Sequence, residues 1–119
     1  MERQPAKSFR DLVVWQKAHQ LVLDVYTVTM SFPKEEIYCL TSQFRRSSIS
    51  VAANIAEAFK KKSAADKARM LNIAQGSLSE TEYYLILSHD LQYGEMKDLK
   101  VRADEVGKIL DSYMKAIKK

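Results

Sequence analysis

The side chains that could support catalysis are few and widely separated in this 119-residue sequence. Asn54, Glu57 and Glu80 carry groups that could take part in proton transfer. We expect all three on packed helices, where structural hydrogen bonding is the more common role. Neither histidine, His19 or His89, follows a Glu by three residues, as the ligands of di-iron helical bundles do. We therefore expect no enzyme activity, no metal and no cofactor.

A cluster of basic residues offers a different chemistry, the binding of phosphate groups. Lys60, Lys61 and Lys62 are consecutive, and Lys67 and Arg69 follow shortly after them. Such a cluster would give salt-sensitive, sequence-independent affinity for nucleic acid. The alternative is a solvated helix end that only aids solubility. In a ring of several copies the cluster would be repeated, which would raise the avidity of the assembly.

The formal charge changes sign along the middle of the chain. Residues 41–69 contain seven basic and two acidic residues, whereas residues 70–95 contain four acidic residues and neither Lys nor Arg. Two explanations are open: an anion-binding surface, or complementary helices within one subunit or between subunits. If the helices are complementary, the candidate ion pairs join Arg45 or Arg46 to Glu80 or Glu82. Such pairs fix the register of two helices more than they add stability.

The segment Gln43–Glu57 carries two neighbouring rows of side chains with helical spacing. The apolar row consists of Phe44, Ser48, Val51 and Ile55. The second row is small and polar, and it consists of Gln43, Ser47, Ser50, Asn54 and Glu57. Such a thin row predicts the close approach of another helix. We expect Gln43, Asn54 and Glu57 to fix the register against residues 63–94 or against a neighbouring subunit.

Low contents of glycine and proline, three Gly and two Pro, indicate long helices. Periodic apolar rows predict four helices. The first covers residues 9–31. The second starts between residues 34 and 41 and ends at 61, the third covers 63–94, and the fourth runs from 95 to the end. Capping boxes are predicted at Ser8 with Asp11 and at Ser63 with Asp66, and Gly94 is the predicted stop of the third helix. The apolar row of the second predicted helix begins at Ile37 and continues through Leu40 to Phe44.

Short connections between long helices predict an all-α, antiparallel up-down-up-down four-helix bundle. It forms one domain over residues 9–119, preceded by a flexible tail at residues 1–8. Cys39 is the only cysteine, so an internal disulfide is excluded. No signal peptide or membrane-spanning stretch is recognisable, and we expect a cytoplasmic protein that does not bind membranes.

Two features of the third predicted helix indicate close packing, and the first of them indicates contact with another subunit. The run from Tyr83 and Tyr84 to Leu87 is apolar or aromatic on all sides, which is typical of a buried helix. Gly76 lies inside the helix, where a glycine usually marks close packing. The alternative for the run is a wide stripe shared by two neighbours in one bundle.

Several motifs resemble one known family, in register over nearly the whole chain. They are LTSQFRR at residues 40–46, SVAANIAE at 50–57, WQKA at 15–18, Phe32-Pro33, and AQGSL at 74–78 with Glu80. This combination resembles the 23S rRNA-intervening-sequence proteins. One departure is Ala58, where the family usually has Gly, and it puts a sharp bend at that point in doubt.

The resemblance implies an antiparallel four-helix bundle in a small bacterial protein, without an established family-wide catalytic activity. Relatives resemble the accessory protein of diversity-generating retroelements, a basic homopentamer that binds nucleic acid and a reverse transcriptase. The resemblance thus implies a homo-oligomer, a pentamer, that binds RNA or DNA weakly. The alternative is an assembly or adaptor module for a protein partner such as a reverse transcriptase, without direct nucleic-acid binding.

Overall fold

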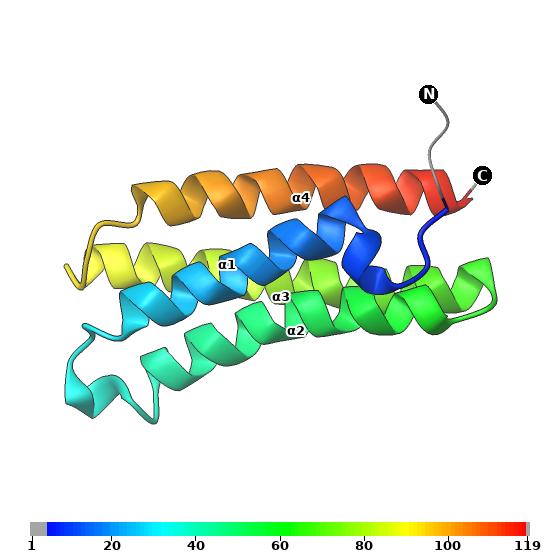
Figure 1. The fold of residues 1–119 in the computed structure, drawn as a ribbon. Coiled ribbons are helices and arrows are strands. Elements are labelled where there is room, and N and C mark those ends of the chain that lie inside the picture. The colour runs from blue at the N-terminus through cyan, green and yellow to red at the C-terminus, as the bar shows by residue number, and fades with distance from the viewer. Residues whose placement is uncertain (1–4, 119) are drawn as a thin grey trace.

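The computed structural model describes residues 5–118, with only the backbone described at residue 118. These residues form four α-helices and two short 3-10 helices (Figure 1). The α-helices are α1 (Val13–Thr29), α2 (Leu40–Lys60), α3 (Ala64–Asp90) and α4 (Lys97–Lys118). The 3-10 helices are η1 (Phe9–Asp11) and η2 (Lys34–Glu36). Residues 1–4 of the predicted tail lie outside the described part.

The four helices form a ring of antiparallel neighbours. Helix α1 packs against α2 and α4, and α3 packs against the same two helices from the other side. Because consecutive helices run in opposite directions, residues 5 and 118 lie at the same end of the bundle (Figure 1). The predicted all-α four-helix bundle is confirmed.

The core contains the predicted apolar row Phe44, Ser48, Val51 and Ile55 together with apolar rows from the other three helices. Its largest completely buried side chains are those of Leu21, Phe44, Ile55, Leu71 and Leu110, which have no exposed surface. Burying an aliphatic or aromatic side chain of this size contributes about 1.5–3 kcal/mol to folding, so these rows hold the helices together.

Small polar residues let α2 and α3 approach closely, and these two helices share the most extensive contact of the bundle. The Ser47 and Thr81 hydroxyls are 2.8 Å apart and both residues are buried. One turn further, the hydroxyls of Ser50 and Ser77 are 2.7 Å apart. Two adjacent cross-helix hydrogen bonds define one register, because a shifted pairing would leave buried hydroxyls without partners.

The chain enters the bundle differently from the prediction. The Ser8 capping box exists, but it caps η1, and α1 starts only at Val13 because Leu12 is extended. The Asp11 carboxylate accepts hydrogen bonds from the backbone N–H groups of Lys7 and Ser8. These bonds lower the pKa of Asp11 below its ordinary value.

The connection between α1 and α2 also corrects the prediction. Ile37 is 53% exposed and precedes α2, so the buried row begins at Leu40 instead. Cys39 is exposed immediately before α2.

At the other end of α2, the helix does not bend sharply at Ala58, where the family usually has Gly. Ala58 is buried and the helix continues through it to Lys60.

The C-terminus of α3 forms a Schellman motif, in which N–H groups beyond the helix bond back to its last carbonyls. The N–H of Tyr93 donates to the carbonyl of Ser88, and that of Gln92 donates to His89. Gln92 therefore occupies the left-handed position, with φ 64°. The prediction that Gly94 stops the helix is wrong, since α3 ends at Asp90.

No helix of the described residues is both long and apolar enough to span a bilayer.

Candidate functional site

The antiparallel topology gathers basic residues at one end of the bundle. This end contains the start of α1, the end of α2, the start of α3 and the end of α4 (Figure 1). Its segments, residues 5–20, 57–72 and 108–117, hold ten basic and four acidic side chains. We call this region the basic end. The 3-10 helix η1 belongs to it, because it packs against α1 and α2.

The three consecutive lysines predicted to bind phosphate lie at the turn between α2 and α3. Lys60 and Lys62 are exposed, and no Asp or Glu of the described residues lies within 4 Å of either amine. Lys61 Nζ is 3.9 Å from Glu57 Oε1, a long pair at the surface that costs little to break. All three ammonium groups are therefore accessible to an external phosphate.

The other two predicted phosphate ligands have partners within the chain. Lys67 Nζ donates hydrogen bonds to the carbonyl oxygens of Ala58 and Phe59, at 3.2 and 3.0 Å. It thereby caps the C-terminal end of α2, where carbonyls lack partners in the helix. Arg69 Nη2 is 3.5 Å from Asp66 Oδ1, and both side chains are exposed. Lys67 has mainly a structural position, whereas Arg69 can still turn to a ligand.

Sequence reasoning missed the other five basic residues at this end, Lys17 and Lys108 among them. Lys7 and Arg10 lie before and within η1, and Lys115 lies in the last turns of α4. All three are exposed. They are distant from Lys60–Lys62 in sequence and come near them only through the topology. The predicted up-down-up-down order could have grouped them, because it places these helix ends together.

The predicted pairing of the basic and acidic segments occurs once, between Arg46 and Glu80. Arg46 Nη2 is 3.7 Å from Glu80 Oε2, and the same guanidinium donates to Gln43 Oε1 at 2.6 Å. Arg45 points instead toward α1. Its Nε donates to Thr29 Oγ1 at 2.8 Å, and its guanidinium lies 4.5 Å from the centre of the Tyr26 ring. The two neighbouring arginines thus join α2 to different helices.

Asn54 and Glu57 also make contacts within their own helix. Asn54 Nδ2 donates to the carbonyl and hydroxyl oxygens of Ser50, and Glu57 faces Lys61. The cross-helix contacts of this row come from Ser47 and Ser50, with Gln43 acting through Arg46. Of the two expected neighbours of this row, residues 63–94 or another subunit, the hydrogen bonds of Ser47 and Ser50 reach the first, α3.

Each of the three candidate proton-transfer residues has a partner within the chain. Asn54 and Glu57 bond within α2, and Glu80 pairs with Arg46. Among residues 5–118, no three His, Cys, Asp or Glu side chains lie close enough together to hold a metal ion. His19 stacks on Trp15 with ring centres 4.9 Å apart.

The outward face of α3 is partly apolar. Tyr83 is 57% exposed and Ile86 55% exposed, whereas Tyr84 and Leu87 pack against the core. Gly76 is also exposed, and a Cβ added there would meet nothing within 4 Å. The close packing expected at Gly76 is therefore absent within the subunit.

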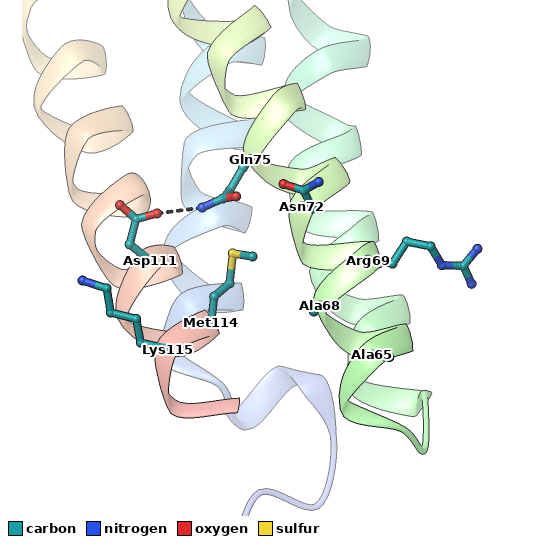
Figure 2. Close-up of a pocket in the computed structure, with 8 residues that line it drawn as sticks. All are labelled: Ala65, Ala68, Arg69, Asn72, Gln75, Asp111, Met114 and Lys115. Carbon is teal, nitrogen blue, oxygen red and sulfur yellow. Dashed lines mark hydrogen bonds between the residues drawn. The ribbon is translucent and has the colours of Figure 1, made fainter. Parts of the chain in front are cut away.

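A groove of about 590 Å³ lies at the basic end between α3 and α4 (Figure 2). Its α3 wall includes Ala65, Ala68 and Asn72, and its α4 wall includes Met114 and Lys115. A hydrogen bond of 2.7 Å from Gln75 Nε2 to Asp111 Oδ1 crosses the groove at one end. The structure thus places a mixed polar and apolar depression beside the exposed lysines.

The comparison with protein families decides the relationship. A model of the family described as 23S rRNA-intervening sequence protein matches residues 10–112. The chain belongs to this family. A crystal structure of an S23 ribosomal protein family member from Bacteroides thetaiotaomicron superposes with a TM-score of 0.79 at 29% identity. The match covers 87% of this chain and 96% of the Bacteroides protein, which is described as having unknown function.

Comparison with curated proteins gave no match. The 23S rRNA-intervening sequence family and the Bacteroides structure are described without an enzymatic activity. The resemblance suggested by the motifs is confirmed. The matched residues include the whole of α1, α2 and α3 and most of α4.

Proposed function

We propose that this 23S rRNA-intervening sequence protein is a non-enzymatic, cytoplasmic homo-oligomer that binds RNA or DNA weakly through its basic end. The observation that carries the proposal is the clustering of exposed basic side chains there. Lys60, Lys61 and Lys62 lead this cluster, and Lys7, Arg10 and Lys115 extend it. Phosphate contacts of this kind give affinity that falls steeply with salt.

Filter binding of structured RNA and duplex DNA over a range of salt concentrations tests this proposal. Reversing Lys60, Lys61 and Lys62 together to Glu should weaken binding and flatten the salt dependence. A matched control reverses Lys34, Lys97 and Lys100, which changes the net charge equally but lies toward the opposite end. Equal losses in both variants would leave only a net-charge effect, and no binding even at low salt would refute the proposal.

The homo-oligomer is supported by the outward face of α3. Tyr83, Ile86 and Ile73 are all about half exposed on this helix, at 57, 55 and 46%. Gly76, between them, would let a second backbone come close, because it has no side chain and faces open space. The resemblance to the retroelement accessory protein favours a pentamer over other rings.

Light scattering after gel filtration tests the assembly. A mass of several times the 13.7 kDa chain is expected, and Tyr83→Glu should reduce it. Tyr38→Glu is the control, because Tyr38 is 95% exposed in the connection before α2. A wild-type mass near one chain would refute the assembly.

The second candidate function is an adaptor that holds a protein partner such as a reverse transcriptase. The same exposed apolar face on α3 favours it. The same variants distinguish nucleic-acid binding from protein binding. An adaptor keeps its protein partner when Lys60, Lys61 and Lys62 are changed to Glu, and it loses the partner in Tyr83→Glu.

A further inference from the structure

The groove between α3 and α4 exists because the first turns of α3 carry very small side chains. Ala65 and Ala68 line it, and the Gln75–Asp111 hydrogen bond holds the two helices together at its inner end (Figure 2). The groove is open to solvent and has a volume of about 590 Å³, which is room for a small group held at the surface. A flat, partly apolar ligand could lie between these walls.

The polar groups of the groove favour hydrogen-bond donors on such a ligand. Gln75 donates to Asp111 Oδ1, and Oδ2 accepts no hydrogen bond from the described residues. The Gln75 side-chain oxygen is a second acceptor, and the Asn72 amide can donate or accept. Ala68 and Met114 supply apolar contact area nearby.

Positive groups flank the same groove. Arg69 and Lys115 line it with their stems, while their charged ends point outward at its two rims (Figure 2). Lys62 precedes Ala65 by only three positions, at the turn into α3. A ligand with an apolar ring, donor groups on its edge and attached phosphates would satisfy all of these features. A second copy of this basic end would not, since its own positive charges would be repelled.

We propose that the groove receives one unpaired nucleobase of the bound nucleic acid and prefers bases that carry an amino group, guanine above all. Guanine presents two adjacent N–H donors, which a carboxylate such as Asp111 accepts, whereas uracil presents one N–H between two carbonyls. The phosphates on either side of the base lie against Lys62, Arg69 and Lys115. This inference rests on the proposed function, because the basic end must bind the strand first.

The test uses three labelled RNA hairpins of equal length, one fully paired, one with a bulged G and one with a bulged U, in fluorescence anisotropy titrations. The wild-type protein should bind the bulged-G hairpin about tenfold more tightly than the other two. Ala68→Leu fills the groove without changing charge, so it should remove this preference and keep the affinity for the paired hairpin. Ala116→Leu is the control, because Ala116 is exposed on α4 and does not line the groove.

A second variant keeps the test independent of folding. Asp111→Asn should lower the preference for G over U, and circular dichroism checks that both variants stay helical. Equal wild-type affinity for the three hairpins would overturn the base pocket and leave the proposed function standing. A preference that survives in folded Ala68→Leu or in Asp111→Asn would also overturn it. Failure to bind any hairpin would overturn the proposed function together with this inference.

Discussion

Lys67 has partners within the chain that the sequence alone does not reveal. Its ammonium group belongs by composition to the basic cluster, yet its Nζ donates to two carbonyls at the end of α2. Nothing in the local sequence indicates this, because the contact requires the turn into α3 to bring the side chain back. The distinction between a capping lysine and a phosphate-binding lysine is therefore tertiary information.

Lys67→Met tests that distinction. The change should lower the free energy of unfolding by about 1 kcal/mol, because two carbonyls lose their donor. It should weaken nucleic-acid binding less than Lys62→Met does. Urea unfolding and filter binding on both variants provide the measurements. A larger binding loss in Lys67→Met than in Lys62→Met, with unchanged stability, would contradict the capping role.

Tyr93 makes the stability depend on alkaline pH. Its hydroxyl donates to Glu36 Oε2 at 2.8 Å, and this hydrogen bond, more than desolvation, raises the pKa of Tyr93. Because the folded pKa is raised, the stabilisation is complete below the ordinary tyrosine pKa of about 10 and is lost as the pH rises through the folded value. Burial raises the pKa of Tyr113 in the same direction.

Tyr93→Phe should accordingly lower the thermal unfolding midpoint near neutral pH, and the difference from wild type should shrink in strongly alkaline solution. Tyr38→Phe serves as the control, since Tyr38 is almost fully exposed. Differential scanning calorimetry at several pH values would check both. A deficit in Tyr93→Phe that stays constant with pH would show that Glu36 does not control the ionisation.

At the scale of the helix, the pairing of α2 with α3 depends on side chains that are small as well as polar. Ser47→Leu should destabilise the protein by about 2–3 kcal/mol, because extra volume would be forced into a buried contact with Thr81. Ser42→Leu, at an exposed position of the same helix, should change stability little. Chemical denaturation of both variants measures the difference, and equal midpoints would show that the helices can separate without cost.

The helices were predictable because each has one apolar row with a regular period. In α3, for example, the side chains that recur at three- and four-residue steps are all buried: Leu71, Ala74, Leu78, Thr81, Leu85 and Ser88. The helix ends were less predictable. Gly94 suggested a stop by composition, whereas backbone hydrogen bonds to Ser88 and His89 end the helix earlier and place Gln92 in the left-handed position. Here the backbone hydrogen bonds after α3 decide where the helix ends, even though the left-handed position is filled by Gln92 and not by a glycine.

At the scale of the whole molecule, the candidate site was only half predictable. Lys60–Lys62 could be found from a run in the sequence, but Lys7, Arg10 and Lys115 join them only when the helix directions are known. The groove was not predicted at all, since alanines on α3 and Met114 on α4 have no sequence pattern in common.

Gly76→Ala connects stability with assembly. In the free subunit an added Cβ meets nothing within 4 Å, so the change should raise helix stability by roughly 0.5–1 kcal/mol. If α3 meets a neighbouring subunit there, the same methyl should shift the oligomer toward smaller species. Denaturation and light scattering on one sample separate the two effects, and a stabilised variant with an unchanged oligomer would place the interface elsewhere.

The position of the chain ends has a practical consequence for anyone who labels this protein. Residues 5 and 118 lie at the same end of the bundle as Lys60–Lys62 (Figure 1). An affinity tag or fluorophore attached beyond these residues would therefore sit beside the basic end, and an acidic tag would compete with nucleic acid for it. Cys39 is exposed before α2 at the opposite end, and as the sole cysteine it offers a single site for a thiol-reactive dye there.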